Sequence, residues 1–329
     1  MQCYLVFLYL EEVCKVDKKC LGMGSIMDIK KLIENVVNKK LHISVREIVK
    51  VGKGASGSVY RVKCNGIPKI IAVKISSHPE LMLQEFEMLS FLKEKTESKI
   101  PNVYFFEQVE NIGVIGMEYI SGICGTDKSI PYSFRKKHLA ESIVNNLLVI
   151  QKAHNDKFGV YNHAVYDTWQ QYYSEFAKDI YTFSKLKYSK QELDAVVMKA
   201  VALSYRNLDI IFSEEISPPT LIHGDYWMPN FIIDKKSMEL LAVVDPFNVM
   251  WADSEYELFA LTAGAGKKLR LYETYKRKVK VSKYCDLKLE LYALYSELLW
   301  YKKQVPVEHS YLRKRAKRLL KEMKKHKMI

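Results

Sequence analysis

The sequence predicts an α+β protein with two lobes, a small antiparallel β N-lobe and a larger helical C-lobe. Its 329 residues are too many for one ordinary hydrophobic core. Strand-like apolar runs separated by turn residues dominate residues 44–120, and helical periodicity dominates most of residues 121–329. We therefore divide the chain into an N-terminal extension with a helix (1–43), an N-lobe (44–120) and a C-lobe (121–329).

The composition is typical of a globular protein from a reducing compartment. Hydrophobic residues make up 48% of the chain and charged residues 27%, which are ordinary values. The six cysteines form no CxxC pair, so we expect free thiols. The apolar run at the N-terminus lacks a basic leader and a cleavage site, and it is too short to span a bilayer. We expect a cytoplasmic protein, and the sequence assigns no role to residues 1–27.

The N-lobe pattern begins after a predicted helix from Asp28 to Lys40. Alternating strand residues flank a glycine-rich GxGxxG segment, Gly52 to Gly57. A dinucleotide-binding fold is the obvious competitor, but that fold needs a helix directly after the glycines, whereas a β-type alternation follows here. Backbone N–H groups in such a segment can approach a phosphate without a side chain in the way. The candidate phosphate-binding residues are Gly52, Gly54, Ser56 and Gly57.

A polar turn in the second half of the chain suggests catalytic chemistry. A short strand ends in the turn His223-Gly224-Asp225, and two apolar runs around a polar turn follow it as a predicted hairpin. Asp225 on a turn can accept a proton from a hydroxyl group. Asn230 and Asp245 are hard oxygen ligands that suit Mg²⁺ carrying phosphates. One base and two metal ligands in this pattern are typical of phosphoryl transfer; the alternative is a metal-free structural turn.

The H-G-D-x-x-x-x-N motif, His223 to Asn230, followed by a strand ending in Asp245, resembles the aminoglycoside phosphotransferase superfamily. That superfamily includes fructosamine kinases and choline kinases and is a distant relative of the protein kinases. The resemblance covers roughly residues 45–260 and implies a protein-kinase-like two-lobed fold that uses ATP and Mg²⁺. Gly224 replaces the Arg of the protein-kinase loop. Asp245-Pro246-Phe247 also departs from the protein-kinase D-F-G, so a protein substrate is disfavoured.

The resemblance also implies a lysine that contacts the α- and β-phosphates of the nucleotide as a point charge. Lys74 is the candidate because the glycine-rich hairpin followed by Ala72-Val73-Lys74 resembles the nucleotide lid of kinases. Lys74 also interrupts an apolar run, where a buried charge requires a partner. A solvated strand lysine is the alternative. A helix is expected from Leu81 to Glu94, and the family's spacing places the partner of Lys74 at Glu85, with Glu87 as the near alternative.

Three further residues are assigned by resemblance alone. The hinge between the lobes would bind adenine through the backbone carbonyl of Glu118 and the backbone N–H of Ile120. Glu257 lies twelve residues after Asp245 (257 − 245), the spacing of an Asp in aminoglycoside kinases. Its implied role is to hold the catalytic loop through backbone N–H groups.

Trp227, two residues after Asp225, resembles the H-G-D-L-W of fructosamine kinases. The Glu257 spacing and Trp227 therefore point to different subfamilies, so the acceptor stays open.

Helical periodicity predicts C-lobe helices over residues 133–155, from Asp167 onward, and over residues 191–212. His154 is expected to end the first of these as a helix-terminal histidine rather than a catalytic one. Asp167 is the expected N-cap of the second, which is rich in aromatic residues. A further helix is expected to begin with residues 251–260, from Trp251 onward.

The C-terminal segment carries most of the net charge. Residues 301–329 contain eleven Lys or Arg and two Glu, a net of +9 (11 − 2) out of +13 for the chain. Interspersed apolar residues predict an amphipathic helix that packs one face on the C-lobe. Contact with nucleic acid or anionic lipid is the alternative. Positive charge here also disfavours a polycationic aminoglycoside as acceptor.

These features predict a small-molecule kinase that moves the γ-phosphate of ATP to a hydroxyl of an amino sugar, aminoglycoside, fructosamine or similar compound. Two other classes stay open. One is a regulatory module that binds the nucleotide without catalysis, and the other is a nucleic-acid-associated protein that acts through residues 301–329. The identity of the acceptor and the oligomeric state cannot be derived from the sequence.

Overall fold

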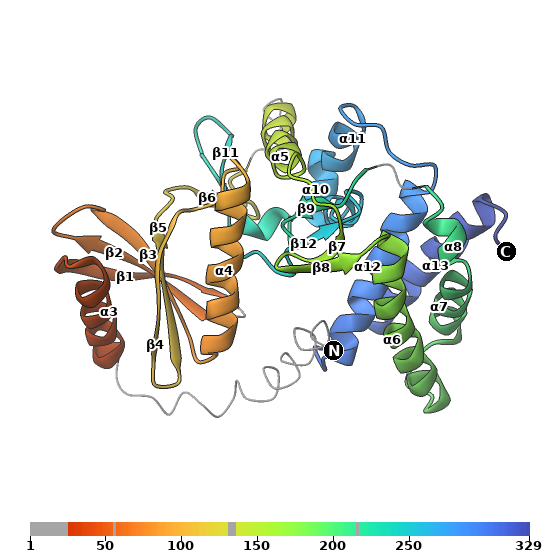
Figure 1. Ribbon diagram of the computed structural model, residues 1–329, viewed down its shortest axis with the longest axis horizontal. Coiled ribbons are helices and arrows are strands. Elements are labelled where there is room, and N and C mark those ends of the chain that lie inside the picture. The colour runs from red at the N-terminus through yellow and green to blue at the C-terminus, as the bar shows by residue number, and fades with distance from the viewer. Residues whose placement is uncertain (1–25, 55–56, 131–135, 215–216) are drawn as a thin grey trace. The chain divides into compact units, whose positions relative to one another are not determined.

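The computed structural model describes residues 26–54, 57–130, 136–214 and 217–329, and it divides into two compact units. The sheet unit comprises the described residues up to 150 together with residues 227–247. The helical unit comprises the described residues of 151–226 and 248–329. Residues 121–150 and 227–247, expected in the C-lobe, thus cluster with the sheet unit. Figure 1 shows the mixture of antiparallel sheets and helices that confirms the predicted α+β class.

A five-stranded antiparallel sheet organises the sheet unit, in the order β1-β2-β3-β5-β4. Two helices lie on different faces of this sheet (Figure 1). The elements are α3 (Ile26–Leu41), β1 (Val45–Gly54), β2 (Gly57–Cys64), β3 (Ile70–Ser76), α4 (Pro79–Lys95), β4 (Val103–Val109) and β5 (Ile112–Glu118).

The two-residue period of β3 decides which residue faces which helix. Ile71 and Val73 are fully buried in a core that they share with α3. Lys74 points to the opposite face, where α4 lies, and this places its charge beside the acidic residues of that helix. A helix at Leu81–Glu94 was predicted and is confirmed with slightly wider bounds.

A second, three-stranded sheet in the sheet unit has the order β11-β10-β6. The predicted hairpin is confirmed as β10 and β11, whose turn is closed by Asp234: its Oδ1 accepts hydrogen bonds from the backbone N–H groups of Lys236 and Ser237. The remaining elements of this unit are β6 (Ile123–Cys124), α5 (Lys136–Ile150), the 3₁₀ turn η1 (Met228–Asn230), β10 (Phe231–Ile233) and β11 (Leu240–Val243).

The helical unit packs four long helices around one aromatic-rich core. Its small sheet has the order β8-β7-β12-β9. The elements are β7 (Phe158–Val160), β8 (His163–Tyr166), α6 (Trp169–Ser189), α7 (Ala195–Arg206), α8 (Leu208–Ile211), β9 (Thr220–Ile222), β12 (Met250–Ala252), α9 (Leu258–Leu261), α10 (Gly264–Leu269), α11 (Leu271–Lys276), α12 (Cys285–Lys302) and α13 (His309–Lys325).

Several predicted helix bounds were wrong. The helix expected over residues 133–155 ends at Ile150, and His154 forms an isolated β-bridge with Thr220 instead of ending a helix. The start expected at residue 133 lies outside the described residues. Thr168, not Asp167, is the N-cap of α6, because its hydroxyl accepts the Gln171 N–H while the Gln171 side chain accepts the Thr168 N–H.

The segment after Asp245 also differs from expectation. Residues 250–252 form strand β12 between β9 and β7, and the helix α9 begins only at Leu258. The apolar run Met250-Trp251-Ala252 suits either structure, and pairing with two distant strands decides in favour of β.

The basic C-terminal helix packs as predicted. Leu312, Ala316, Leu319 and Met323 lie on one face of α13 and are fully buried in the core of the helical unit. The basic residues on the opposite face are exposed, and their contact with nucleic acid or anionic lipid stays a prediction. Within the described part of the chain, no helix combines the length and the apolar character needed to cross a bilayer.

Candidate active site

The glycine-rich segment forms the tip of the β1-β2 hairpin. Gly54 pairs with Gly57, and strand β2 continues directly from the glycines, as the β-type alternation predicted. Gly57 has φ +152°, and a Cβ at this position would lie 2.3 Å from the Ile75 carbonyl oxygen, so only glycine fits. The predicted phosphate-binding residue Ser56 lies outside the described residues.

Lys74 forms a buried ion pair with Glu85. Its Nζ donates to both carboxylate oxygens, at 2.9 and 2.7 Å, and both side chains are less than a tenth exposed. The partner of Lys74 in this ion pair is thus Glu85 rather than Glu87. Burial raises the pKa of Glu85 to about 7, although Lys74 opposes this rise. Burial also lowers the pKa of Lys74, but attraction by Glu85 and Asp245 outweighs it, so that pKa is raised.

Asp245 brings a second carboxylate to the same lysine. Its Oδ1 accepts a hydrogen bond from Lys74 Nζ at 2.6 Å, and its side chain is 50% exposed. The backbone at Asp245 has φ +54°, a left-handed conformation that is strained for a non-glycine residue. An aspartate in such a conformation is frequent at functional positions, and here it directs an accessible carboxylate to Lys74.

Asn230 lies beside the same residue, and the role of the two as metal ligands stays a prediction. Its side-chain Nδ2 donates to the backbone carbonyl oxygen of Asp245 at 3.5 Å. The backbone carbonyl oxygen of Asn230 accepts the Val244 N–H at 3.0 Å. The side chains of Asn230 and Asp245 offer hard oxygen donors and one negative charge. This donor set fits Mg²⁺, which is usually held by one or two carboxylates together with substrate phosphates.

The proposed adenine-binding residues lie at the end of β5. Glu118 is the last residue of that strand, and its Oε2 accepts hydrogen bonds from the Asn102 side chain at 2.7 Å and the Asn102 backbone at 3.1 Å. Ile120 follows two residues later, outside any strand. Their backbone roles stay predictions.

The loop with Asp225 belongs to the helical unit, where Glu257 holds it. The backbone N–H of Gly224 donates to Glu257 Oε1 at 2.7 Å, and that of His223 donates to Oε2 at 3.1 Å. Gly224 has φ +80°, which explains why glycine occupies this turn. The carboxyl group of Glu257 therefore accepts from two successive N–H groups directly before the partly exposed Asp225.

The environment of Glu257 perturbs its titration strongly. Burial raises the pKa of Glu257 to about 8, the N–H groups of His223 and Gly224 oppose the rise, and the charge of Asp225 adds to it.

Sequence reasoning missed a second buried lysine. Lys288 on α12 contacts Asp253 and Glu255, and all three side chains are less than a tenth exposed. Lys288 stands between Leu287 and Leu289 in a helix with many apolar residues. The reasoning that singled out Lys74, that a lysine within an apolar run requires a partner, applies equally to Lys288 and was the available signal.

Comparisons with known proteins identify the family and the fold. The family model for fructosamine kinases matches residues 25–325. No curated protein sequence matches the chain. A putative fructosamine-3-kinase from Haemophilus somnus 129PT is similar in structure, with a TM-score of 0.63 and 15% sequence identity, over 88% of this chain and 96% of that one.

Two aminoglycoside phosphotransferases have the same fold. APH(4)-Ia has a TM-score of 0.65 and 15% identity over 91% of this chain and 99% of its own. APH(2")-IIa, in a ternary complex with streptomycin and ATP, has a TM-score of 0.60 and 20% identity over 91% of this chain and 97% of its own. The fold is thus protein-kinase-like, as predicted. Since the fructosamine kinase model spans nearly the whole chain, the protein belongs to the fructosamine kinase family and is a small-molecule kinase.

Proposed function

We propose that the protein transfers the γ-phosphate of ATP to a hydroxyl group of a fructosamine-type sugar amine, with Mg²⁺ as cofactor. The observation that carries this proposal is the contact of the buried Lys74 with Glu85 and with the accessible Asp245. Membership in the fructosamine kinase family supports the acceptor class. The ternary complex of APH(2")-IIa with ATP supports the choice of nucleotide.

The sheet unit would bind the nucleotide. Backbone N–H groups of the glycine-rich segment, with Gly57 kept free of a side chain, would cover the phosphates. Lys74 would orient the α- and β-phosphates, because Glu85 holds its ammonium group in one position. The backbone at Glu118 and Ile120 would hydrogen-bond the adenine.

Asn230 and Asp245 would hold the metal ion. When bound, Mg²⁺ neutralises negative charge on the phosphates as the terminal group leaves. One oxygen of Asp245 accepts a hydrogen bond from Lys74, and its half-exposed carboxylate has a face accessible to a cation. A phosphate arriving at Lys74 would take over part of that contact and free Asp245 for its role as ligand.

Asp225 would act on the acceptor. It would align the hydroxyl oxygen with the γ-phosphorus and accept the hydroxyl proton as the new P–O bond forms and the bond to the β-phosphate oxygen breaks. Since the transition state of phosphoryl transfer is loose, alignment contributes more than early proton removal. Glu257 would maintain the loop geometry through the N–H groups of His223 and Gly224.

ATP consumption with Mg²⁺ against a panel of acceptors tests the proposal. The panel holds fructosamines, ribulosamines, aminoglycosides, choline and hexosamines. We expect turnover with a fructosamine and a loss of about 10²–10⁴-fold in Asp225→Ala, with ATP binding retained. Asp167→Asn, an exposed aspartate of the same unit, is the matched control and should keep wild-type activity.

Two results would contradict the proposal. Retained turnover in Asp225→Ala would remove the assignment of the base. Turnover confined to another acceptor class would keep the kinase and overturn the fructosamine assignment.

A further inference from the structure

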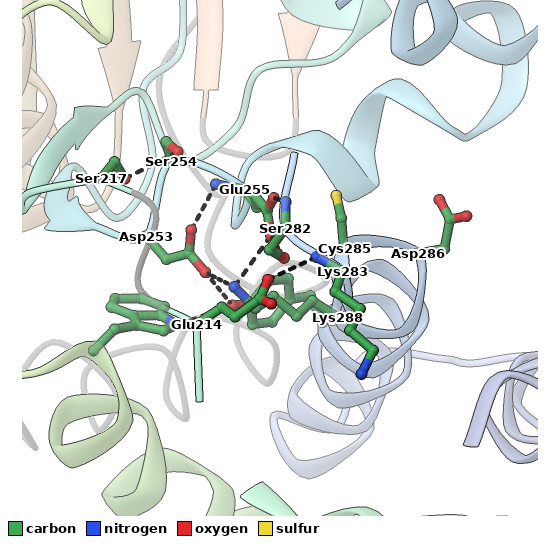
Figure 2. Close-up of polar contacts among 12 residues, drawn as sticks. Glu214, Ser217, Asp253, Ser254, Glu255, Ser282, Lys283, Cys285, Asp286 and Lys288 are labelled. Carbon is green, nitrogen blue, oxygen red and sulfur yellow. Dashed lines mark hydrogen bonds and ion pairs between the residues drawn. The ribbon is translucent and has the colours of Figure 1, made fainter. Parts of the chain in front are cut away.

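Lys288 in the helical unit lies at the centre of a fully buried charge cluster. Its Nζ donates to Asp253 Oδ2 at 2.8 Å and lies 3.1 Å from Glu255 Oε2 (Figure 2). Lysine is almost never buried without such partners. Burial lowers the pKa of Lys288, but the two carboxylates outweigh this and raise it, so the lysine stays charged.

Further hydrogen bonds fix both carboxylates in orientation. Ser282 donates to Glu255 twice, from its backbone N–H at 2.5 Å and from its hydroxyl at 2.7 Å. Asp253 accepts the Glu255 N–H at 2.9 Å through one oxygen and the Tyr292 hydroxyl at 3.2 Å through the other. Figure 2 shows Asp253 and Glu255 reaching Lys288, with Ser282 beside Glu255. The cluster therefore holds the backbone of residues 253–255 in one conformation.

This segment is joined to the catalytic loop through the side chain of Glu257. Strand β12 pairs with β9, with Ala252 opposite Thr220 and Met250 opposite Ile222, so residues 253–257 leave the sheet at the end where β9 begins and the catalytic loop leaves it at the other end. Two residues after Glu255, the carboxyl group of Glu257 accepts the N–H groups of His223 and Gly224. All of these residues belong to the helical unit.

We propose that Lys288 is a positioning residue for phosphoryl transfer. It clamps Asp253 and Glu255, thereby sets the location of Glu257, and through Glu257 sets the geometry of the loop that carries Asp225. The proposal rests on the proposed function, in which Asp225 aligns the acceptor. Apolar side chains of similar volume can stabilise a core as well as a buried ion cluster does, whereas an ion cluster with many fixed hydrogen bonds specifies one local geometry.

Two variants test the proposal in the full-length protein. Lys288→Met removes the charge and keeps most of the volume, and Ser282→Ala removes only the hydroxyl bond to Glu255. In both, we expect kcat to fall, by about tenfold to a hundredfold in Lys288→Met, because small displacements of reacting groups are costly. The KM for ATP should not change, since the predicted nucleotide-binding residues lie in the other unit.

A second readout does not depend on activity. Hydrogen exchange of the His223 and Gly224 amides should accelerate in Ser282→Ala, by about tenfold if one hydrogen bond to a charged group is transmitted to the loop. Amides of α13, which are remote in sequence and have no bond to the cluster, should keep wild-type exchange.

Two controls separate positioning from simple stability. Lys302→Met breaks the pair with Asp179, another lysine–aspartate contact of α12. Leu319→Ala opens the core of the same unit and lowers its thermal stability without changing any residue of the charge cluster. Both should keep the wild-type kcat at temperatures where they are folded.

The outcomes are distinct. Unchanged kcat and unchanged loop exchange in Ser282→Ala would overturn the positioning role, even if Lys288→Met does not fold. Equal losses of kcat in Leu319→Ala and Lys288→Met would show that the loss of kcat comes from general destabilisation, and this would also overturn the positioning role. If the wild type transfers phosphate to no acceptor, the proposed function fails. The exchange of the His223 and Gly224 amides in Ser282→Ala is measured without turnover, so an unchanged rate there overturns the positioning role independently.

Discussion

Two buried lysines of this protein each contact two carboxylates, and they differ in how accessible those carboxylates are. Lys74 pairs with the buried Glu85 and with Asp245, whose side chain is 50% exposed. Lys288 pairs with Asp253 and Glu255, whose side chains are 9% and 1% exposed. The chemical groups are alike, but only the first set includes a partner that solvent or a ligand can reach.

This difference separates a binding group from a structural one. Asp245 makes one hydrogen bond to Lys74 from a strained backbone and can exchange it for another ligand. Asp253 and Glu255 are held by further donors from Ser282, Tyr292 and the backbone, so no exchange is available to them. Accessibility of one partner, rather than the presence of an ion pair, indicates which lysine takes part in binding.

Among the substitutions at these lysines, Lys288→Met should lower the free energy of unfolding most. In Lys288→Met, two buried carboxylates lose their cation, and we expect the free energy of unfolding of the helical unit to fall by about 3–5 kcal/mol. Urea denaturation measures this loss. The triple variant Asp253→Asn, Glu255→Gln, Lys288→Met carries no unpaired charge and should recover most of the stability. A loss below about 1 kcal/mol in the single variant would show that the cluster is not a fixed structural unit.

Lys74→Met should instead affect activity more than stability. We expect kcat/KM to fall by about 10²–10³-fold, the usual cost of removing one charged or polar donor from a transition state. Unfolding should be less affected than in Lys288→Met, because Asp245 is half exposed and Glu85, with a pKa of about 7, can take up a proton. Steady-state kinetics and urea denaturation of the same preparation measure the two effects. A greater loss of stability here than at Lys288 would reverse the comparison.

The titration of the buried Glu257 should make the free energy of unfolding depend on pH. Burial raises its pKa from the ordinary 4.5 to about 8, so the folded state binds a proton more tightly than the unfolded state. The stabilising contribution of this group is complete below about pH 4.5 and is lost as the pH rises through about 8. In Glu257→Gln, the decline in the free energy of unfolding between those values should be shallower. Identical slopes in urea denaturation at pH 5, 6, 7 and 8 would contradict the raised pKa.

The smallest expected effect is at Lys302, a third lysine that bonds to a carboxylate. Its pair with Asp179 is about 30% exposed on both sides. We expect Lys302→Met to lower the free energy of unfolding by less than about 1 kcal/mol, as for other solvent-exposed ion pairs. A loss as large as that of Lys288→Met would show that burial does not distinguish these lysines.

The contrast between the two clusters also explains what could be predicted. Lys74 was found because the glycine-rich hairpin followed by Ala72-Val73-Lys74 resembles a kinase nucleotide lid, and its place within a short apolar strand supported the assignment. Lys288 also stands between apolar residues, but it lies in an 18-residue helix with buried residues on most sides, where the two-residue period of a strand does not apply. Its partners Asp253 and Glu255 lie more than thirty residues earlier, and only their approach in space reveals the cluster.

The wrong secondary-structure predictions have a similar origin. Met250-Trp251-Ala252 became a strand because β9 and β7 pair with it from both sides. His154 left its predicted helix to bridge Thr220. In both places, hydrogen bonds to residues far away in the chain outweigh a weak local preference.

From the sequence alone we derived the order of most elements, the glycine-rich hairpin and the candidate residues Lys74, Asp225, Asn230 and Asp245, with a resemblance to the aminoglycoside phosphotransferase superfamily. The fructosamine kinase family itself was identified by the family model. The features derived from the sequence depend on periodicity and on short spacings, which are properties of neighbouring residues. Only the tertiary structure decided that Glu85 rather than Glu87 pairs with Lys74, that Asp245 also contacts it, and that Lys288 is buried with two carboxylates. The physical reason is that a buried charge is stabilised by whichever opposite charge the folded chain brings within hydrogen-bonding distance, and that choice is made by long-range packing.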